Sequence, residues 1–337
     1  MELATWLAEH GVLPDAAIRV GMRRFIAAIE TAPPVDDADF ARGMDTHAIA
    51  EHAAVANAQH YELPAAFFAC FLGPRRKYSC CHYPAGIETL AEAEDIALAD
   101  TCAHAGLADG QRILEMGCGW GSLSLWMAEH YPAARITAVS NSASQRRHIQ
   151  AVAQARRLAN LEVVTADANG FMPQGRFDRI VSVEMFEHMA NWRPLLARLR
   201  GALTPNGRLF VHIFTHRDRP SRYDADDGNW MAQHFFTGGI MPSPGLIRQF
   251  ADLFAVEEDW RWSGAHYQRT AEQWLANFDA ARPAIDPILR NVYGDDAALW
   301  ARRWRMFLMA TAESFGHDQG RVWGVNHYRL APAGWNS

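Results

Sequence analysis

The hydrophobic positions divide the chain of 337 residues into a helical first part and a second part of alternating strands and helices. In the first part, apolar side chains recur at helical spacing at Ile18, Met22, Phe25, Ile26 and Ile29. Pro33-Pro34 ends that helix, and a second helical pattern runs from residue 50 to 72. Since no alternating strand pattern precedes residue 110, we expect residues 1–76 to form a helical N-terminal cap.

From residue 110 onward, short buried strands alternate with helices. Apolar runs predict strands at Arg112–Met116, Ile136–Val139, Leu161–Thr165, Arg179–Val183, Arg208–Ile213 and Val322–Leu330. Helices are predicted at Ser122–His130, Ser142–Leu158 and Trp192–Leu203, the last closed by Pro205-Asn206-Gly207, and later at Ala271–Ala281 and Ala297–Phe315. This alternation is typical of a parallel sheet covered by helices on both faces. We therefore expect an α/β fold over residues 77–337, with a Rossmann-like, seven-stranded, mostly parallel sheet and insertions in its C-terminal half.

Composition and charge narrow the class of protein. The formal net charge of -6 argues against nucleic acid as a partner, and a membrane contact is not expected from it. The five cysteines include no Cys-x-x-Cys pair, which indicates reduced thiols and no metal site. The acidic run Asp224, Asp226 and Asp227 is interpreted as a solvated loop. The sequence shows neither a signal-peptide pattern nor an apolar run long enough to span a membrane, so we expect a cytoplasmic protein.

A glycine-rich turn follows the first predicted strand. Gly117, Gly119 and Gly121 lie between that strand and the helix that begins at Ser122. Glycine permits the sharp turn and lets backbone amides approach a ligand at a helix N-terminus. The spacing is Gly-x-Gly-x-Gly rather than Gly-x-Gly-x-x-Gly, which disfavours a pyrophosphate ligand. A tight turn without any ligand is the structural alternative.

The motif Ile113-Leu114-Glu115-Met116-Gly117-Cys118-Gly119-Trp120-Gly121 resembles motif I of class I methyltransferases. It is most similar to the branch that holds cyclopropane fatty acid synthases and coclaurine-type N-methyltransferases. Further segments resemble this branch: Ala56–Tyr61, Lys77–Cys80, Ala138–Gln145, Glu184–Met189 and Gly264–Tyr267. Their joint order covers the chain from about residue 50 to the C-terminus.

The resemblance implies S-adenosylmethionine as cofactor and assigns it a set of binding residues. These are Tyr78, Ser79, Gly117, Gly119, Asn141, Gln145, Asp167 and Ala168. Many class I enzymes bind the ribose through an acidic residue after the second strand, whereas this sequence has Ser140-Asn141 there. An N-cap is the structural alternative for Asp167.

Two carboxylates and an imidazole follow the fourth predicted strand, at Glu184, Glu187 and His188. That loop lies at the carboxyl edge of the sheet, where parallel sheets bind ligands. An ammonium acceptor must lose a proton before its nitrogen can attack, and a carboxylate with a neighbouring histidine can attract the cation and accept the proton. The resemblance gives the three residues these catalytic roles. Helix capping and core packing are the structural alternatives.

A second set of residues favours the other enzyme type of this branch, the cyclopropane synthases. Cys80, Glu187, His212 and Tyr267 fall on positions that hold bicarbonate in cyclopropane synthases, which act on lipid acyl chains. Those lipid enzymes usually have Gly where this chain has Glu184. A glutamate beside the methyl group suits a cationic amine better than an alkene.

Aromatic residues gather in the C-terminal half, which would suit a flat or cationic acceptor through stacking and cation–π attraction. We expect the acceptor to contact His212, Trp230, His234, Phe235, Tyr267 and Trp323. Core packing is the alternative for each of them.

These observations predict an S-adenosylmethionine-dependent N-methyltransferase of a small, aromatic, benzylisoquinoline-like amine. The alternative enzyme is a cyclopropane-type methyltransferase of unsaturated lipid acyl chains, and it would need to meet a membrane. A protein that binds the cofactor without turnover is the third hypothesis. A homodimer is possible under any of them.

Overall fold

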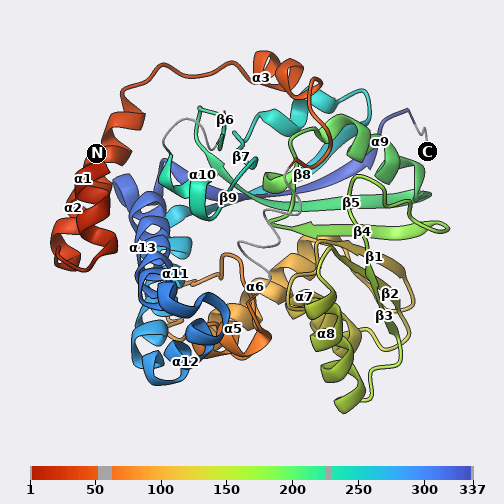
Figure 1. Cartoon of the computed structure of the whole chain (residues 1–337). Helices are drawn as coiled ribbons and strands as arrows, with labels where there is room; N and C mark the ends of the chain where they lie inside the picture. The colour runs from red at the N-terminus through yellow and green to blue at the C-terminus, as the bar shows by residue number, and fades with distance from the viewer. Residues whose placement is uncertain (1, 52–62, 225–228, 335–337) are drawn as a thin grey trace.

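The computed structural model describes residues 2–51, 63–224 and 229–334. A seven-stranded sheet runs through the molecule in the order β3-β2-β1-β4-β5-β9-β8 (Figure 1). Its strands are β1 (Arg112–Met116), β2 (Arg135–Ser140), β3 (Leu161–Thr165), β4 (Phe177–Val183), β5 (Leu203–His216), β8 (Phe254–Ser263) and β9 (Trp323–Pro332). The first five strands are parallel, and β9 pairs antiparallel with β5 and β8. The predicted Rossmann-like, mostly parallel sheet is confirmed.

Alternate residues of the buried strands face different helices, which therefore cover both faces of the sheet. Ile113 of β1 and Val181 of β4 pack with α6 (Leu90–Ala105) and α7 (Ser122–His130). Leu114 and Ile180, one residue away, pack with α9 (Trp192–Gly201). The helix α8 (Ala143–Ala155) lies on the α6 face through contacts with β2 and β3. The strands β1, β2 and β4 run in the same direction, so the loops that follow their carboxyl ends lie at one edge of the sheet.

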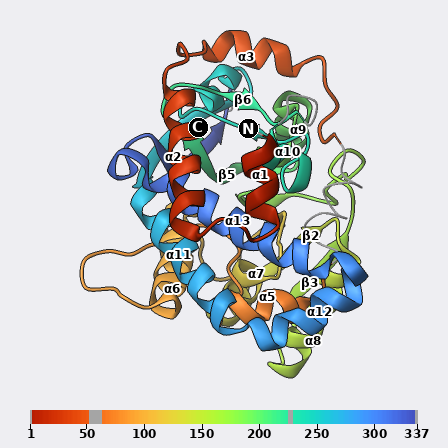
Figure 2. The ribbon, with the colours of Figure 1, turned by 60° about the vertical axis from the view of Figure 1, so that its left-hand side comes forward.

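The N-terminal helices pack on helices from the far end of the chain. The helices α1 (Glu2–Glu9) and α2 (Asp15–Glu30) lie against α13 (Ala297–Gly316) in both Figure 1 and Figure 2. Arg19 of α2 forms ion pairs with Glu272 of α11 (Gly264–Ala280) at 2.6 Å and with Glu313 of α13 at 2.8 Å. The described residues of the cap predicted over residues 1–76 form helices and connecting loops, but its boundary with residues 77–337 stays a prediction.

Four further α-helices lie outside the sheet in the described residues. They are α3 (Asp37–Met44), α5 (Ala65–Phe71), α10 (Trp230–His234) and α12 (Arg282–Tyr293). Phe67, Phe68 and Phe71 of α5 are fully buried against α11, α12 and α13. A small ladder of β6 (Ser221–Arg222) and β7 (Ile240–Met241) lies beside α10. No helix in the described ranges combines the length and the apolar character that crossing a membrane requires.

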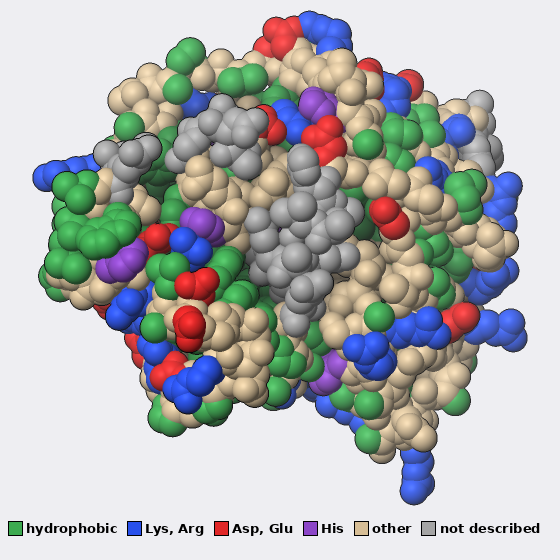
Figure 3. Space-filling view, viewed as in Figure 1, with side chains coloured by type: hydrophobic (Ala, Val, Ile, Leu, Met, Phe, Trp, Pro, Cys, Tyr) green, Lys and Arg blue, Asp and Glu red, His purple; other side chains and the backbone are tan. Residues whose placement is uncertain are grey.

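Large hydrophobic side chains remain exposed on the first two helices. Hydrophobic atoms gather over α1 and α2 at the left of Figure 3, where Leu3, Trp6, Val12 and Phe25 are among the exposed residues. Phe25 was expected on the buried face of its helix, and it is 46% exposed although Ile26 beside it is buried.

Two predictions about strands were incomplete. The strand β5 begins at Leu203, which pairs with Phe177, and the register then shifts before Arg208 pairs with Arg179. Residues 204–207, predicted as the end of a helix and a turn, are therefore an irregularity within the strand. The strand β8 was not predicted at all. It lies at the sheet edge, and only Phe254 and Trp262 of its ten residues are buried, so it lacks the apolar run that predicted the central strands.

Candidate active site

The glycine turn after β1 shows why glycine is needed at each position. Gly117 has φ +79°, and a Cβ there would lie 2.7 Å from the Cβ of Met185. Gly121 has φ +83°, and its Cβ would lie 2.6 Å from Cγ1 of Ile149. Gly119 has φ +51° but faces open space. Left-handed backbone at all three positions favours glycine, and close packing forbids a side chain at two of them.

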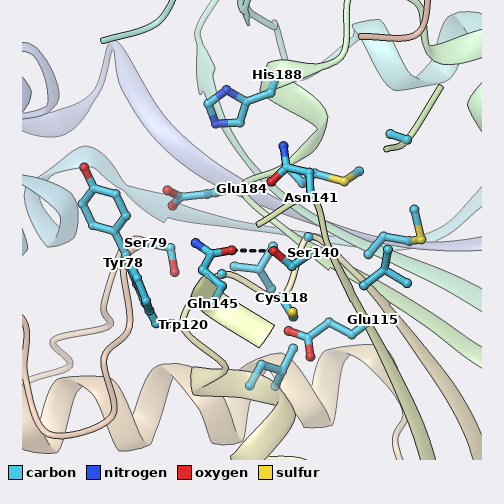
Figure 4. A pocket seen from close by; sticks show the side chains of 18 of the residues that line it. Tyr78, Ser79, Glu115, Cys118, Trp120, Ser140, Asn141, Gln145, Glu184 and His188 are labelled. Atoms are coloured by element: carbon cyan, nitrogen blue, oxygen red, sulfur yellow. Dashed lines mark hydrogen bonds between the residues drawn. The ribbon is translucent and has the colours of Figure 1, made fainter. Parts of the chain in front are cut away.

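This turn borders a cavity of about 140 Å³ at the carboxyl edge of β1, β2 and β4. All eight residues predicted to bind the cofactor line it: Tyr78, Ser79, Gly117, Gly119, Asn141, Gln145, Asp167 and Ala168. Figure 4 shows Tyr78 and Trp120 on one side of the cavity, with Asn141 and Ser140 across from them and His188 above. Residues at the ends of β1, β2 and β4, in the loop after β3 and in the loop before α6 thus converge on one space.

Unpartnered donors in this cavity fit a polar ligand. The side-chain nitrogens of Gln145 and Trp120 are buried and have no hydrogen-bond partner among the described residues. Gln145 Oε1 accepts from Ser140 Oγ at 2.6 Å, which leaves its amide nitrogen for another acceptor. A buried donor without a partner costs stability, so a ligand that accepts from it is stabilised there. Asp167 is exposed and accepts from the backbone N–H of Asn169 in its own loop. A turn and not a helix follows it, so it is not an N-cap.

Trp120 and Ser140 also line this cavity but were not among the residues predicted to bind the cofactor, although both lie in motifs that were identified. Trp120 is part of the glycine turn, and Ser140 ends the second strand. Their places at the carboxyl ends of neighbouring strands were the signal that could have found them.

A second cavity, of about 610 Å³, lies under the N-terminal helices. Its walls are mostly apolar and include Ile18, Met22 and Ile29 of α2, together with residues of α13 and the aromatic side chains of the C-terminal half. Tyr78, Glu184 and His188 line both cavities, so the two spaces meet there. The N-terminal helices, for which the sequence predicted no function, therefore form one wall of this cavity.

Three of the six residues predicted to contact the acceptor line the second cavity, namely Trp230, Tyr267 and Trp323. The other three do not line it. Phe235 is fully buried, where its ring stacks on Phe307 with centroids 4.6 Å apart. His234 lies 3.6 Å from Glu9 in an ion-pair cluster. Phe235 thus follows the alternative of core packing, His234 is partly buried beside Glu9, and His212 lies behind Glu184.

The backbone of Glu184 is in a conformation that side chains rarely adopt, with φ +46°. Such strain costs about 1–3 kcal/mol and persists where surrounding structure holds it. Here the carboxylate accepts from the backbone N–H of Cys80 at 2.9 Å and from the Tyr267 hydroxyl at 2.7 Å. His212 Nε2 lies 3.2 Å from the same carboxylate. The position that is usually glycine in the lipid enzymes thus holds a strained glutamate, fixed by three neighbours.

Three of these neighbours belong to the set that the resemblance assigns to bicarbonate. Cys80, His212 and Tyr267 all contact the carboxylate of Glu184, the first through its backbone. The coexistence of Glu184 with this set, which had no explanation from sequence, follows from the geometry: the glutamate places its own carboxylate among these groups.

Burial and one nearby cation set the charge of Glu184. Its side chain is 8% exposed, and desolvation raises its pKa above 4.5. Lys77 opposes that rise, and its buried ammonium is held by Ser79 Oγ at 2.5 Å and the Cys80 carbonyl at 2.6 Å. Hydrogen bonds from Cys80 and Tyr267 also favour the charged form.

The other two residues predicted as catalytic have different environments. His188 borders both cavities, and burial lowers its pKa to about 4, so its imidazole is neutral at pH 7. Glu187 is fully buried and lines neither cavity, although its Oε1 accepts from the Phe214 N–H at 2.7 Å. Burial and the nearby charge of Glu184 raise the pKa of Glu187 well above 4.5, which keeps it protonated. Of the three, Glu184 and His188 are in contact with the space for ligands.

The fold, the glycine turn and the cavity together are typical of one class of protein. Comparison with known families identifies that class. Residues 49–325 match the family of mycolic acid cyclopropane synthetases. The chain belongs to this family and is an S-adenosylmethionine-dependent methyltransferase, which confirms the predicted branch, enzyme class and cofactor.

Its relatives include both enzyme types of that branch. The (S)-coclaurine N-methyltransferase of Thalictrum flavum subsp. glaucum is 35% identical over 275 residues, which cover 80% of this chain and 76% of that protein. The cyclopropane-fatty-acyl-phospholipid synthase of Escherichia coli (strain K12) is 31% identical over 269 residues, covering 79% of this chain and 66% of that protein. A solved coclaurine N-methyltransferase bound to N-methylheliamine and SAH is 32% identical, with a TM-score of 0.92 over 96% of this chain and 97% of that one.

Replacement of Gly117 by Val should abolish cofactor binding, because its Cβ would press on Met185 and force the turn away from the cavity. Titration calorimetry with S-adenosylhomocysteine measures the affinity. Gly110→Val is the matched control: Gly110 has the same φ of +79° but open space around its Cβ and a place outside the cavity. Both variants should lose stability through strain, whereas only Gly117→Val should lose affinity. Equal affinities would place the cofactor elsewhere.

Proposed function

We propose that this enzyme transfers the methyl group of S-adenosylmethionine to the nitrogen of a benzylisoquinoline-like amine. The observation that carries the proposal is the buried carboxylate of Glu184 at the junction of a polar cavity and a mostly apolar, aromatic one. An ammonium group on an aromatic scaffold complements both features, since its charge meets the carboxylate and its rings meet aromatic walls. The resemblance to (S)-coclaurine N-methyltransferases supports the same substrate class.

The residues of this chain would bind and deprotonate the amine, while the bound cofactor supplies an electrophilic methyl group on its sulfonium. Glu184 attracts the ammonium and accepts one proton from its nitrogen, which frees the lone pair for attack. His188, neutral at pH 7, is available to accept a hydrogen bond from the remaining N–H. Tyr267 and the backbone of Cys80 hold the carboxylate in place. Positioning of this kind supplies much of the acceleration in an in-line displacement.

Glu187 would act on the reaction only through its neighbours. Its carboxyl oxygen accepts from the backbone of β5 and fixes the loop that carries Glu184 and His188. We therefore propose it as a positioning residue. Cytoplasmic location and a homodimer also stay predictions.

A methyl-transfer screen with labelled S-adenosylmethionine tests the function. The acceptors are simple tetrahydroisoquinolines, 1-benzyl-tetrahydroisoquinolines and vesicles of unsaturated phospholipid. We expect label in the isoquinolines. Label in the vesicles alone would establish the lipid alternative, and binding of the cofactor without any labelled product would favour the non-catalytic hypothesis.

Replacement of each glutamate by glutamine should separate their roles. Glu184→Gln removes a negative charge that meets the amine, so we expect kcat/KM for the amine to fall at least 100-fold. Glu187→Gln replaces a protonated carboxyl by a neutral amide of similar shape, so a fall of less than about fivefold is expected. Steady-state kinetics and a titration of cofactor affinity are carried out on both variants. A larger loss in Glu187→Gln than in Glu184→Gln would reverse the assignment.

The pH dependence should report Glu184 rather than His188. Because burial raises the pKa of Glu184 above 4.5, its charged form is lost as the pH falls through that raised value. Burial lowers the pKa of His188 to about 4, so its imidazole stays neutral over the pH range in which Glu184 titrates. We expect an acid limb in kcat/KM with an apparent pKa above 4.5, measured at saturating cofactor. Enzyme returned to neutral pH must regain full activity. A limb near 4 would contradict this assignment.

A side chain at Gly21 should narrow the second cavity without backbone strain. Gly21 lines the cavity from α2, and a Cβ there meets nothing within 4 Å. For Gly21→Leu we expect KM for a 1-benzyl-tetrahydroisoquinoline to rise at least fivefold, with a smaller change for tetrahydroisoquinoline itself. Gly43→Leu is the control, since Gly43 is also helical and unobstructed but lies on α3, outside the cavity. Equal KM values in both variants would show that α2 does not bound the acceptor.

A further inference from the structure

The chain contains a single lysine. Of its 32 lysine and arginine residues, Lys77 is the only lysine and every other one is an arginine. Both side chains are cations, but the lysine ammonium is a compact point charge, whereas the arginine guanidinium is a larger, planar fork. The one departure from arginine therefore points to a position where the compact charge itself matters.

The side chain of Lys77 is buried at the edge of the cofactor cavity. Lys77 is 1% exposed, lies in the loop before α6 and lines the first cavity. Its Nζ donates to Ser79 Oγ at 2.5 Å and to the carbonyl of Cys80 at 2.6 Å. Its backbone N–H donates to Glu94 of α6 at 3.2 Å. Lysine is almost never fully buried without a specific reason, because removing its charge from water is costly.

Each acceptor of the Lys77 ammonium belongs to a different part of the site. Ser79 lines the cofactor cavity. Cys80 accepts from the ammonium through its carbonyl and donates its own backbone N–H to Glu184 at 2.9 Å. Lys77 and Glu184 are thus joined through the backbone of one residue. The ammonium therefore fixes the short segment that connects the cofactor cavity with the carboxylate.

Lys77 also acts on Glu184 through its charge. Burial raises the pKa of Glu184, and Lys77 is the largest of the influences that lower it. Both acceptors bonded to the ammonium are neutral groups, so its positive charge is not cancelled by a directly bonded carboxylate. A nearby cation favours the ionised form of a carboxyl group. Without it, Glu184 would be a buried carboxylate with no compensating positive charge, which is an unfavourable state.

We propose that Lys77 is a positioning residue that keeps Glu184 charged and aligned for the ammonium group of the acceptor. The inference rests on the proposed function, which requires an ionised carboxylate before the amine binds. Lys77 is not among the described residues that line the second cavity, so it acts on the acceptor through Glu184 and Cys80.

Few groups around the ammonium change charge in mildly acidic and neutral solution. The titratable groups that interact with Lys77 are Cys80, Cys81, Glu94, Glu184, His212 and His327. Burial raises the pKa of both thiols and lowers the pKa of both histidines well below 6.5, so these four stay uncharged. Glu187, His188 and Tyr267 also face Glu184, and burial keeps them uncharged as well. Among the described residues, this leaves Glu184 and Glu94, whose pKa burial raises to about 7.

A protein with one lysine allows a direct measurement of this coupling. Enzyme labelled with carbon-13 at the lysine ε-carbon, made without a lysine-containing tag, gives one lysine signal by NMR, and that signal belongs to Lys77. In the complex with S-adenosylhomocysteine, we expect it to shift as the pH falls and Glu184 takes up a proton. Glu184→Gln should lack this step and keep the separate step of Glu94. A signal that titrates identically in both proteins would overturn the inference.

Kinetics of variants separate the charge of Lys77 from its hydrogen bonds. Lys77→Met removes both, whereas Lys77→Gln removes the charge and keeps an N–H donor. Because the cation lowers the pKa of Glu184, both variants should move the acid limb of kcat/KM for 1-benzyl-tetrahydroisoquinoline to higher pH. At neutral pH we expect kcat/KM to fall about tenfold. Arg75→Met is the matched control, since Arg75 is a neighbouring cation that pairs with Asp95 and Glu129 outside both cavities.

The control should keep the acid limb of the wild-type enzyme. A wild-type limb in both Lys77 variants, or an equal displacement in Arg75→Met, would limit Lys77 to a structural role. If the Lys77 variants do not fold, the lysine signals of the wild type and Glu184→Gln decide the inference. If the wild-type enzyme methylates no amine, the proposed function fails, whereas the lysine signal still shows whether Lys77 and Glu184 are coupled.

Discussion

A carboxylate that is removed from water must be stabilised by the protein, and the site of this enzyme is organised around that requirement at Glu184. Its charge is balanced by the buried ammonium of Lys77 and by donors from Cys80 and Tyr267, which come from distant parts of the chain. These contacts fix the loop before α6, the end of β4 and the start of α11 relative to one another. The strained backbone at Glu184 is tolerated because these contacts over-determine its position.

The same carboxylate is the feature on which the proposed choice of an amine over a lipid rests. Where the lipid enzymes usually have glycine, this chain places a side-chain carboxylate among His212, Tyr267 and the backbone of Cys80. A fixed anion at the methyl-transfer position favours a cationic acceptor, and the proposed specificity follows from this single residue. The apolar second cavity alone would accommodate either substrate class.

The N-terminal helices have a part in this arrangement that their own sequence does not suggest. The helix α2 is held on α11 and α13 by the ion pairs of Arg19 and closes the larger cavity with Ile18, Met22 and Ile29. Exposed ion pairs contribute little energy, but Arg19 is largely buried and pairs with two carboxylates, so it fixes the helix more firmly than a surface pair would. Under the proposed function, the space for the acceptor is thereby bounded by a helix that lies far from the glycine turn in sequence.

The sequence by itself determined the sheet, the cofactor turn and the class of enzyme. The strand β1 is a buried apolar run that ends in a glycine turn, and the glycines of that turn reflect a local backbone requirement, so both are visible in a few consecutive residues. All eight residues predicted for the cofactor share one cavity because the carboxyl ends of parallel strands meet at one edge.

Only the tertiary structure decided which residues face the acceptor and what surrounds Glu184. Trp230 and Phe235 lie in one short stretch of aromatic sequence, yet the first lines the cavity and the second is buried beside Phe307. The edge strand β8 has no buried apolar run to predict it, since only two of its ten residues are buried. The pairing of His212 with His327 is set by the register of two antiparallel strands, and the roof of the cavity by the docking of α2. Such contacts join residues far apart in the chain, and their energies depend on burial and distance that no local pattern of residues records.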